Sequence, residues 1–176
     1  NVCSAGCRFC NFRRTPADGD AYVLTEAQLV AKVEELFRLG GRQILLQGGL
    51  HPDLPWTWYL NLLRRLKARF PDLHVHGFSP PEICHFARRF GKSLDAVLAE
   101  LIDAGLDSIP GGGAEILVDA VRREISPGKG TSAEWLAVMA AAHRRGLRTT
   151  ATMMFGHVET DAQRIEHLVA LRRLQD

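Results

Sequence analysis

Three cysteines lie within the first ten residues, at the spacing Cys3-x3-Cys7-x2-Cys10. In a reducing compartment such clustering indicates metal or redox chemistry rather than a disulfide framework. A structural zinc site needs four protein ligands, and a conventional iron–sulfur cluster is also held by four cysteines. Three thiolates therefore predict a cluster with one iron left open to an exogenous ligand. A zinc-binding interaction module, completed by a distant histidine, is the alternative from another class.

The fourth cysteine, Cys84, stands in Glu82-Ile83-Cys84-His85-Phe86, a segment with the pattern of a helix. Free cysteine is among the most buried residue types and behaves as a small apolar side chain. We therefore predict that Cys84 belongs to the core and is not a fourth ligand.

The elements that must position these residues alternate between strand and helix. The predicted strands cover 43–47, which reads as buried, 74–78, 106–109 and 148–154. The predicted helices cover 25–39, 55–70, two segments between 81 and 105, one segment carrying Ile116, Leu117 and Val121, 131–146, and a last one from Thr160. Thr25, Thr131 and Thr160 each stand three residues before a Gln or Glu, a pattern that predicts capping boxes at the starts of three of these helices.

Strictly alternating β and α units form parallel sheets, so the predicted fold is α/β. We expect a partial (β/α) barrel of the TIM type, with a fifth strand just upstream of Cys3. A doubly wound open sheet is the competing fold. No G-x-G-x-x-G follows the first predicted strand, which counts against that fold.

Each predicted strand ends in a loop rich in glycine or polar residues: Gly48-Gly49, Ser79–Glu82, Pro110–Glu115 and Gly156–Glu159. The active site of a (β/α) barrel lies at the carboxyl ends of its strands, so these loops are the expected site. Three consecutive glycines lose much conformational entropy on folding, so they are expected where a ligand or another segment must approach the backbone closely. Glu82 is interpreted as a helix-capping acid or a substrate contact, and Arg122 as a surface arginine, with pairing to a carboxylate as the alternative.

Bulk composition narrows the class of protein. The chain has 176 residues, 46% hydrophobic and 24% charged, with a net charge of +2. This charge is small and the basic residues are spread out, so we expect no nucleic-acid partner. There is no apolar run that could span a membrane and no signal peptide, so we expect a cytoplasmic protein without a membrane partner.

The cysteine spacing, with Phe9 just before the last cysteine, resembles the signature of the radical S-adenosylmethionine (SAM) superfamily. The resemblance implies a [4Fe–4S] cluster on Cys3, Cys7 and Cys10, with SAM as the second cofactor. The reduced cluster splits SAM, and the resulting 5′-deoxyadenosyl radical abstracts a hydrogen from the substrate. The cofactor contacts that the resemblance implies are Phe9, Gly48, Gly49, Ser79, Glu115, Gly156 and Glu159.

The same resemblance implies one radical SAM core domain over residues 1–176. The chain begins without an initiator Met and ends without a helix stop signal, so we expect a fragment that lacks an N-terminal segment and the C-terminal part of the barrel. Two departures from the superfamily pattern stand out. Leu50 replaces the acidic residue that often follows the glycine pair, and Thr152 and Met154 replace the first residues of the motif that ends in Gly156 and Glu159.

Four longer segments, 47–52, 78–83, 105–117 and 151–160, resemble the menaquinone and deazaflavin branch of the superfamily. Within this branch the resemblance is strongest to dehypoxanthine futalosine cyclase (cyclic dehypoxanthine futalosine synthase). Aminofutalosine synthase and the deazaflavin (F0) synthase subunit are the alternatives. The F0 subunit tends to carry Thr-Ala where this chain has Gly112-Gly113.

A cyclase implies a small nucleoside-type substrate and a reductase or flavodoxin-type electron donor, in the futalosine route of menaquinone biosynthesis. A hydrogen would leave the substrate's ribose, and the sugar radical would then close onto a benzoate ring. Restoring the aromatic ring requires a base. The catalytic candidates are His157 and Glu82, and one of His74 or His76 is a further possibility.

Overall fold

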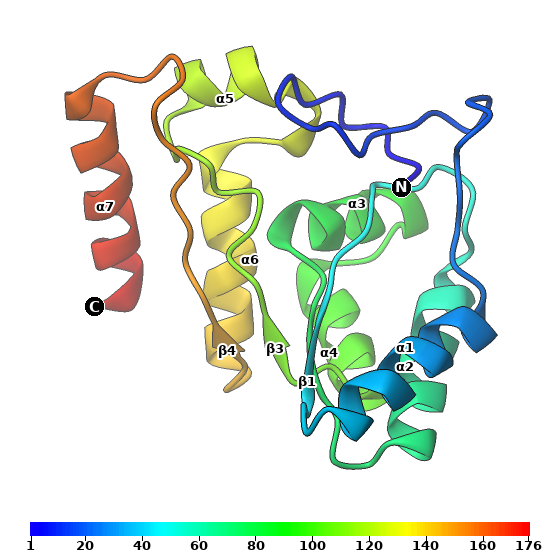
Figure 1. Ribbon diagram of the computed structural model, residues 1–176. Helices are drawn as coiled ribbons and strands as arrows, with labels where there is room; N and C mark the ends of the chain where they lie inside the picture. The colour runs from blue at the N-terminus through cyan, green and yellow to red at the C-terminus, as the bar shows by residue number, and fades with distance from the viewer.

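The computed structural model describes residues 1–176 as alternating strands and helices (Figure 1). The elements are α1 (Glu26–Arg38), β1 (Gln43–Leu46), α2 (Trp56–Arg69), β2 (His74–Gly77), α3 (Pro80–Phe90), α4 (Leu94–Ala104), β3 (Ser108–Ile109), α5 (Asp119–Ile125), the 3-10 turn η1 (Pro127–Lys129), α6 (Ser132–Arg144), β4 (Arg148–Thr149) and α7 (Asp161–Gln175). The capping boxes predicted at Thr25, Thr131 and Thr160 are confirmed, since each threonine and the side chain three residues later exchange hydrogen bonds with the backbone.

The four strands form one parallel sheet in the order β1-β2-β3-β4. Each new strand is therefore added at the same edge, as in a barrel wall. A doubly wound sheet would instead reverse its strand order partway. The predicted partial (β/α) barrel is confirmed.

The core lies between the sheet and the helices on one of its faces. Val75 and Ile109 are fully buried there, within a cluster to which α2, α3, α4 and α6 also contribute. The other face of the sheet is more open, and Leu45 on β1 is 63% exposed. No helix of the chain combines the length and apolar character that crossing a bilayer requires.

Three predicted elements differ from the structure. The strand over 43–47 is not buried, because β1 is the edge of the sheet and its residues alternate between exposed and half-buried. The helix expected to contain Ile116 and Leu117 begins only at Asp119. The strand predicted to reach Met154 ends at Thr149.

The early end of β4 has a local cause. Beyond Thr149 the chain bonds to the glycine loop that follows β3, instead of continuing the ladder. Thr150 Oγ1 accepts a hydrogen bond from Gly111 N (2.9 Å), and Thr152 Oγ1 donates one to Gly111 O (2.7 Å). These side chains replace strand pairing and bring the 150–154 segment against the loop after β3.

Candidate active site at the carboxyl ends of the strands

The cysteine loop is fastened to the turn that follows β1. Cys3 Sγ accepts hydrogen bonds from Leu50 N (3.2 Å) and Ala5 N (3.4 Å). Ser4 donates to Leu50 O through both its backbone N and its Oγ, at 3.1 Å each. The loop is also bonded at its far side, where Gly128 N donates to Ala5 O at 3.1 Å. The fold thus holds the first cysteine directly over the end of a strand.

Gly49 makes this docking possible. A Cβ built on Gly49 would collide with the carbonyl oxygen of Val2 and would stand 2.6 Å from the Cβ of Cys3. Real Cβ atoms essentially never come this close, so only glycine allows the two segments to touch. The contact between this turn and SAM that the resemblance implies stays a prediction, and the structure shows a contact of the turn with the cysteine loop.

All three N-terminal cysteines line one cavity of about 520 Å³, which also reaches Gly48, Gly49 and Ser79. Cys7 is buried, Cys3 is half-buried and Cys10 is exposed. Burial raises the pKa of Cys7, and the nearby Lys129 ammonium partly opposes that rise. None of the four cysteines forms a disulfide, so the thiols of the three N-terminal cysteines are free to bind metal.

Coordination of a single ion and of a cluster place different demands on the arrangement of these thiols. No three His, Cys, Asp or Glu side chains are arranged to hold one metal ion, as the zinc alternative requires. A cubane cluster is different, because each cysteine ligates a separate iron and the thiols stand apart around it. Cys84 is buried on α3, and burial raises its pKa to about 11, as expected for a core cysteine rather than a ligand.

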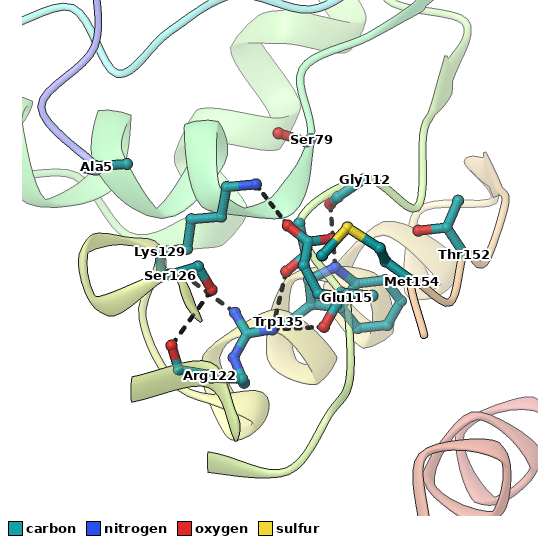
Figure 2. Close-up of polar contacts among 12 residues, drawn as sticks. Ala5, Ser79, Gly112, Glu115, Arg122, Ser126, Lys129, Trp135, Thr152 and Met154 are labelled. Carbon is teal, nitrogen blue, oxygen red and sulfur yellow. Dashed lines mark hydrogen bonds and ion pairs between the residues drawn. The ribbon is translucent and has the colours of Figure 1, made fainter. Parts of the chain in front are cut away.

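Lys129 is a site residue that sequence reasoning missed. Its Nζ forms an ion pair with Glu115 Oε1 at 2.6 Å (Figure 2). The same Nζ lies 5.2 Å from the ring centroid of Phe9. Burial lowers the pKa of Lys129, but the Glu115 carboxylate more than offsets this, and the net shift is upward. Lys129 is therefore a fixed positive charge beside the cysteines. Its position in Pro127-Gly128-Lys129-Gly130, a turn between two helices, was the only signal in the sequence.

The prediction that Arg122 lies on the surface is wrong, because the side chain is only 1% exposed. Its guanidinium donates to four backbone carbonyls, Gly113 O (2.9 Å), Ala114 O (2.7 Å), Gly130 O (3.0 Å) and Lys129 O (3.5 Å). A guanidinium can satisfy several acceptors at once, which allows one side chain to join the two loops. Arg122 thereby positions Glu115 and Lys129 for their ion pair.

Glu82 is buried and joins the loops after β1 and β2. Its carboxylate accepts hydrogen bonds from Gly48 N (3.0 Å), Ser79 N (2.8 Å) and Ser79 Oγ (2.6 Å). Burial raises the pKa of Glu82 to about 7, against the opposing effect of these bonds. The capping role considered for Glu82 is confirmed, and the side chain also lines the cavity.

The glycine loop after β3 is shaped around its small residues. A Cβ on Gly112 would stand 2.5 Å from Gln47 Nε2, and one on Gly113 would overlap the ring of Pro81. Gly113 also has a φ of +80°, a backbone conformation that glycine favours. Trp135 Nε1 donates to Gly112 O at 3.3 Å (Figure 2).

The structure does not bring the 156–159 segment to the cysteine cavity. Glu159 accepts hydrogen bonds from Gly156 N (2.6 Å) and Arg164 Nε (2.7 Å), and its pKa is lowered to about 2, mainly by the bond from Gly156. His157 Nε2 lies 2.8 Å from Met154 O, and its Nδ1 lies 3.0 Å from Glu159. None of Gly156, His157 and Glu159 lines the cavity, and neither does Glu115, which reaches it through Lys129.

Comparisons with known proteins agree with this site. A family model described as the radical SAM superfamily matches residues 1–171. An FO synthase of Nocardia farcinica is 45% identical over 176 residues, which are all of this chain and 20% of that protein. The 5-amino-6-(D-ribitylamino)uracil–L-tyrosine 4-hydroxyphenyl transferases of Microcystis aeruginosa and Methanothermobacter thermautotrophicus are each 43% identical over the whole chain.

The chain spans 48% of each of these two transferases. These relatives support the deazaflavin alternative better than the predicted resemblance to dehypoxanthine futalosine cyclase, which they do not confirm. The superfamily prediction is confirmed, and with it a [4Fe–4S] cluster and SAM as cofactors. With a family match over 171 residues and three thiols facing one cavity, the chain belongs to the radical SAM superfamily.

Proposed function

We propose that this chain is the cofactor-binding part of a radical SAM enzyme that joins the 4-hydroxyphenyl group of L-tyrosine to 5-amino-6-(D-ribitylamino)uracil. The observation that carries the proposal is the end-to-end match, at 43% identity, to transferases named for that reaction. The match includes the glycine, serine and glutamate loops described above, because it covers the whole chain.

Cys3, Cys7 and Cys10 would hold the cluster, and the open cavity beside them would take SAM. When bound, the cluster and SAM together supply the 5′-deoxyadenosyl radical that abstracts a hydrogen from the substrate. The chain's own residues position and shield this chemistry. Radical reactions depend on near-contact geometry, so the fastening of the cysteine loop to the β1 turn matters more than acid–base strength.

Two buried groups keep the cavity in shape. Glu82 fixes the Gly48 turn to Ser79, so the loops after β1 and β2 keep one spacing. Lys129 supplies a positive charge near the thiolates, and Glu115 holds it in place. A cation beside deprotonated sulfur lowers the cost of gathering negative charge there. Phe9, Trp58 and Tyr59 contribute aromatic surface to the lining of the cavity.

A second candidate is the cyclisation of dehypoxanthine futalosine, favoured by the Gly112-Gly113 pair. Subunits of F0 synthase tend to carry Thr-Ala here, and in this structure a Cβ on either glycine would meet Gln47 or Pro81. The loop is therefore built around the residues that carried the resemblance to the cyclase. Of the two predicted bases, Glu82 lines the cavity and stays a candidate for either reaction, whereas His157 lies outside the cavity lining.

The experiment is anaerobic reconstitution of the cluster, followed by incubation with SAM, a reductant and one substrate set at a time. With L-tyrosine and 5-amino-6-(D-ribitylamino)uracil we expect 5′-deoxyadenosine together with a product that carries the 4-hydroxyphenyl group, detected by mass spectrometry. Product formed only from dehypoxanthine futalosine would replace the proposal with the second candidate. Turnover of neither set would reject both.

A further inference from the structure

The open face of the sheet carries three hydrogen-bonded polar side chains that lie outside the lining of the cysteine cavity. Ser108 Oγ lies 2.7 Å from His74 Nε2 and 2.6 Å from His76 Nδ1. The two histidines flank Val75, which is fully buried on the helix side. Because side chains alternate along a strand, both imidazoles lie on the face opposite the helices.

Ser108 couples the two rings. A serine hydroxyl has one hydrogen to donate and lone pairs to accept with. If it donates to His76 Nδ1, it accepts from His74 Nε2–H, and the reverse arrangement is equally consistent with the two distances. In the first arrangement the outer nitrogen of His76 is a donor and that of His74 is an acceptor. In the second arrangement these two roles are exchanged.

The outer nitrogens, His74 Nδ1 and His76 Nε2, have no hydrogen-bond partner in the chain, and both residues are half-buried. Burial, followed by the neighbouring His74, lowers the pKa of His76, which favours the uncharged ring. The outer nitrogens of the two rings, one a donor and the other an acceptor, match a ligand hydroxyl, which both donates and accepts. They match a carboxylate or phosphate poorly, because those groups favour fixed positive charge.

We propose that His76, Ser108 and His74 form a subsite for the polyhydroxylated chain of the substrate. The inference rests on the proposed function, since it assigns this subsite to the ribityl group of 5-amino-6-(D-ribitylamino)uracil. In the second candidate reaction the same subsite takes the ribose. β2 runs from His76 through Gly77 to the loop of Ser79 and Glu82, which lines the cavity, whereas the three subsite residues lie on the open sheet face outside that lining.

The test compares two ligands on the reconstituted protein by anaerobic equilibrium dialysis. One ligand is 5-amino-6-(D-ribitylamino)uracil, and the other is the same pyrimidine with a methylamino group in place of the ribitylamino group. We expect Ser108→Ala and His76→Phe each to weaken binding of the ribityl ligand about fivefold to tenfold, as the loss of one or two hydrogen bonds implies. Binding of the methylamino analogue should stay unchanged.

A matched control is Thr149→Val. Thr149 Oγ1 lies 2.8 Å from His143 Nε2, so this variant also removes a hydroxyl–histidine bond. Thr149 is paired in register with Ile109 and therefore lies on the helix side, where it should not affect either ligand. Iron content and 5′-deoxyadenosine formed without substrate establish that each variant is folded and loaded.

The outcomes separate the subsite from the reaction. If the wild type makes the transfer product and both variants keep its preference for the ribityl ligand, the subsite is overturned and the proposed transfer reaction still holds. If Ser108→Ala and His76→Phe lose the preference for the ribityl ligand but the wild type makes no transfer product, the subsite is supported and the proposed transfer reaction is rejected. If the wild type shows no ribityl preference, the same comparison is made with dehypoxanthine futalosine and its analogue without ribose. Absence of a preference there as well overturns the subsite.

Discussion

Lys129 Nζ and Glu115 Oε1 lie 2.6 Å apart, and their side chains are only 21% and 8% exposed. The pair joins the turn η1 to the loop after β3, next to the cysteines. Removing one partner of a buried pair leaves the other charge uncompensated, which costs far more than losing an exposed pair. The pair thus holds η1 against the loop after β3, and its Lys129 supplies positive charge at the site.

Lys129→Met should therefore lower the free energy of unfolding by about 3 kcal/mol, since it leaves the Glu115 carboxylate buried and unpaired. Arg69→Met is the matched control. Arg69 pairs with Glu34 at 3.1 Å on an exposed surface, so its loss should cost less than about 1 kcal/mol. Denaturant unfolding of both variants, in the same cluster state, measures the difference. Equal losses would contradict the importance given to the Lys129 pair.

Gly49→Ala should prevent the cysteine loop from docking, because the new methyl group would occupy the space of Val2 O and the Cys3 Cβ. We expect most of the iron to be lost after reconstitution. Gly19→Ala is the control, because a Cβ there meets nothing within 4 Å. Iron and sulfide assays decide between the two results. Full iron content in Gly49→Ala would show that the close approach is not needed to hold the cluster.

Glu82 should make stability depend on pH in a specific direction. Its pKa rises from 4.5 to about 7 on folding, so the folded protein retains a proton that the unfolded chain releases earlier. The stabilisation is complete below pH 4.5 and disappears as the pH rises through about 7, with an amplitude on the order of 3 kcal/mol. Glu82→Gln should remove this slope. Unfolding curves between pH 5 and 8 test the sign, and an identical slope in both proteins would contradict the raised pKa.

Arg122→Leu should be more destabilising than any exposed arginine substitution. Replacement by an apolar side chain leaves the carbonyls of Gly113, Ala114 and Gly130 without their donor. Each unsatisfied buried acceptor costs about 1–3 kcal/mol, so the variant should lose several kcal/mol. Chemical denaturation with Arg123→Leu as the neighbouring control measures this. A loss no larger than in the control would show that other donors replace the guanidinium.

The sequence predicted those parts of the fold that depend on local patterns. Helix starts follow from threonine capping boxes, and the parallel sheet follows from strict alternation of strands and helices. The end of β4 could not be predicted, because it depends on a hydrogen bond between Thr152 and Gly111, which lies 41 residues earlier in the chain. The exposure of β1 likewise depends on its place at the sheet edge.

Site residues could be predicted where cluster binding requires a set spacing of ligands along the sequence. They were harder to predict where tertiary packing determines which side chains reach the site. The three cysteines stand out by their spacing alone. Lys129 and Arg122 do not, because a single basic residue near a turn or on a short helix has the same local pattern whether it is exposed or buried. Their roles follow only from the contacts with Glu115 and the glycine loop.

The most direct test of the account is iron content and SAM cleavage across four single cysteine variants. The account predicts about four irons per chain in the reconstituted wild type and in Cys84→Ala, together with 5′-deoxyadenosine on reduction. Cys3→Ala, Cys7→Ala and Cys10→Ala should lose 5′-deoxyadenosine formation and most of the iron. A protein that binds one zinc per chain, or whose SAM cleavage survives loss of an N-terminal cysteine but not of Cys84, would contradict it.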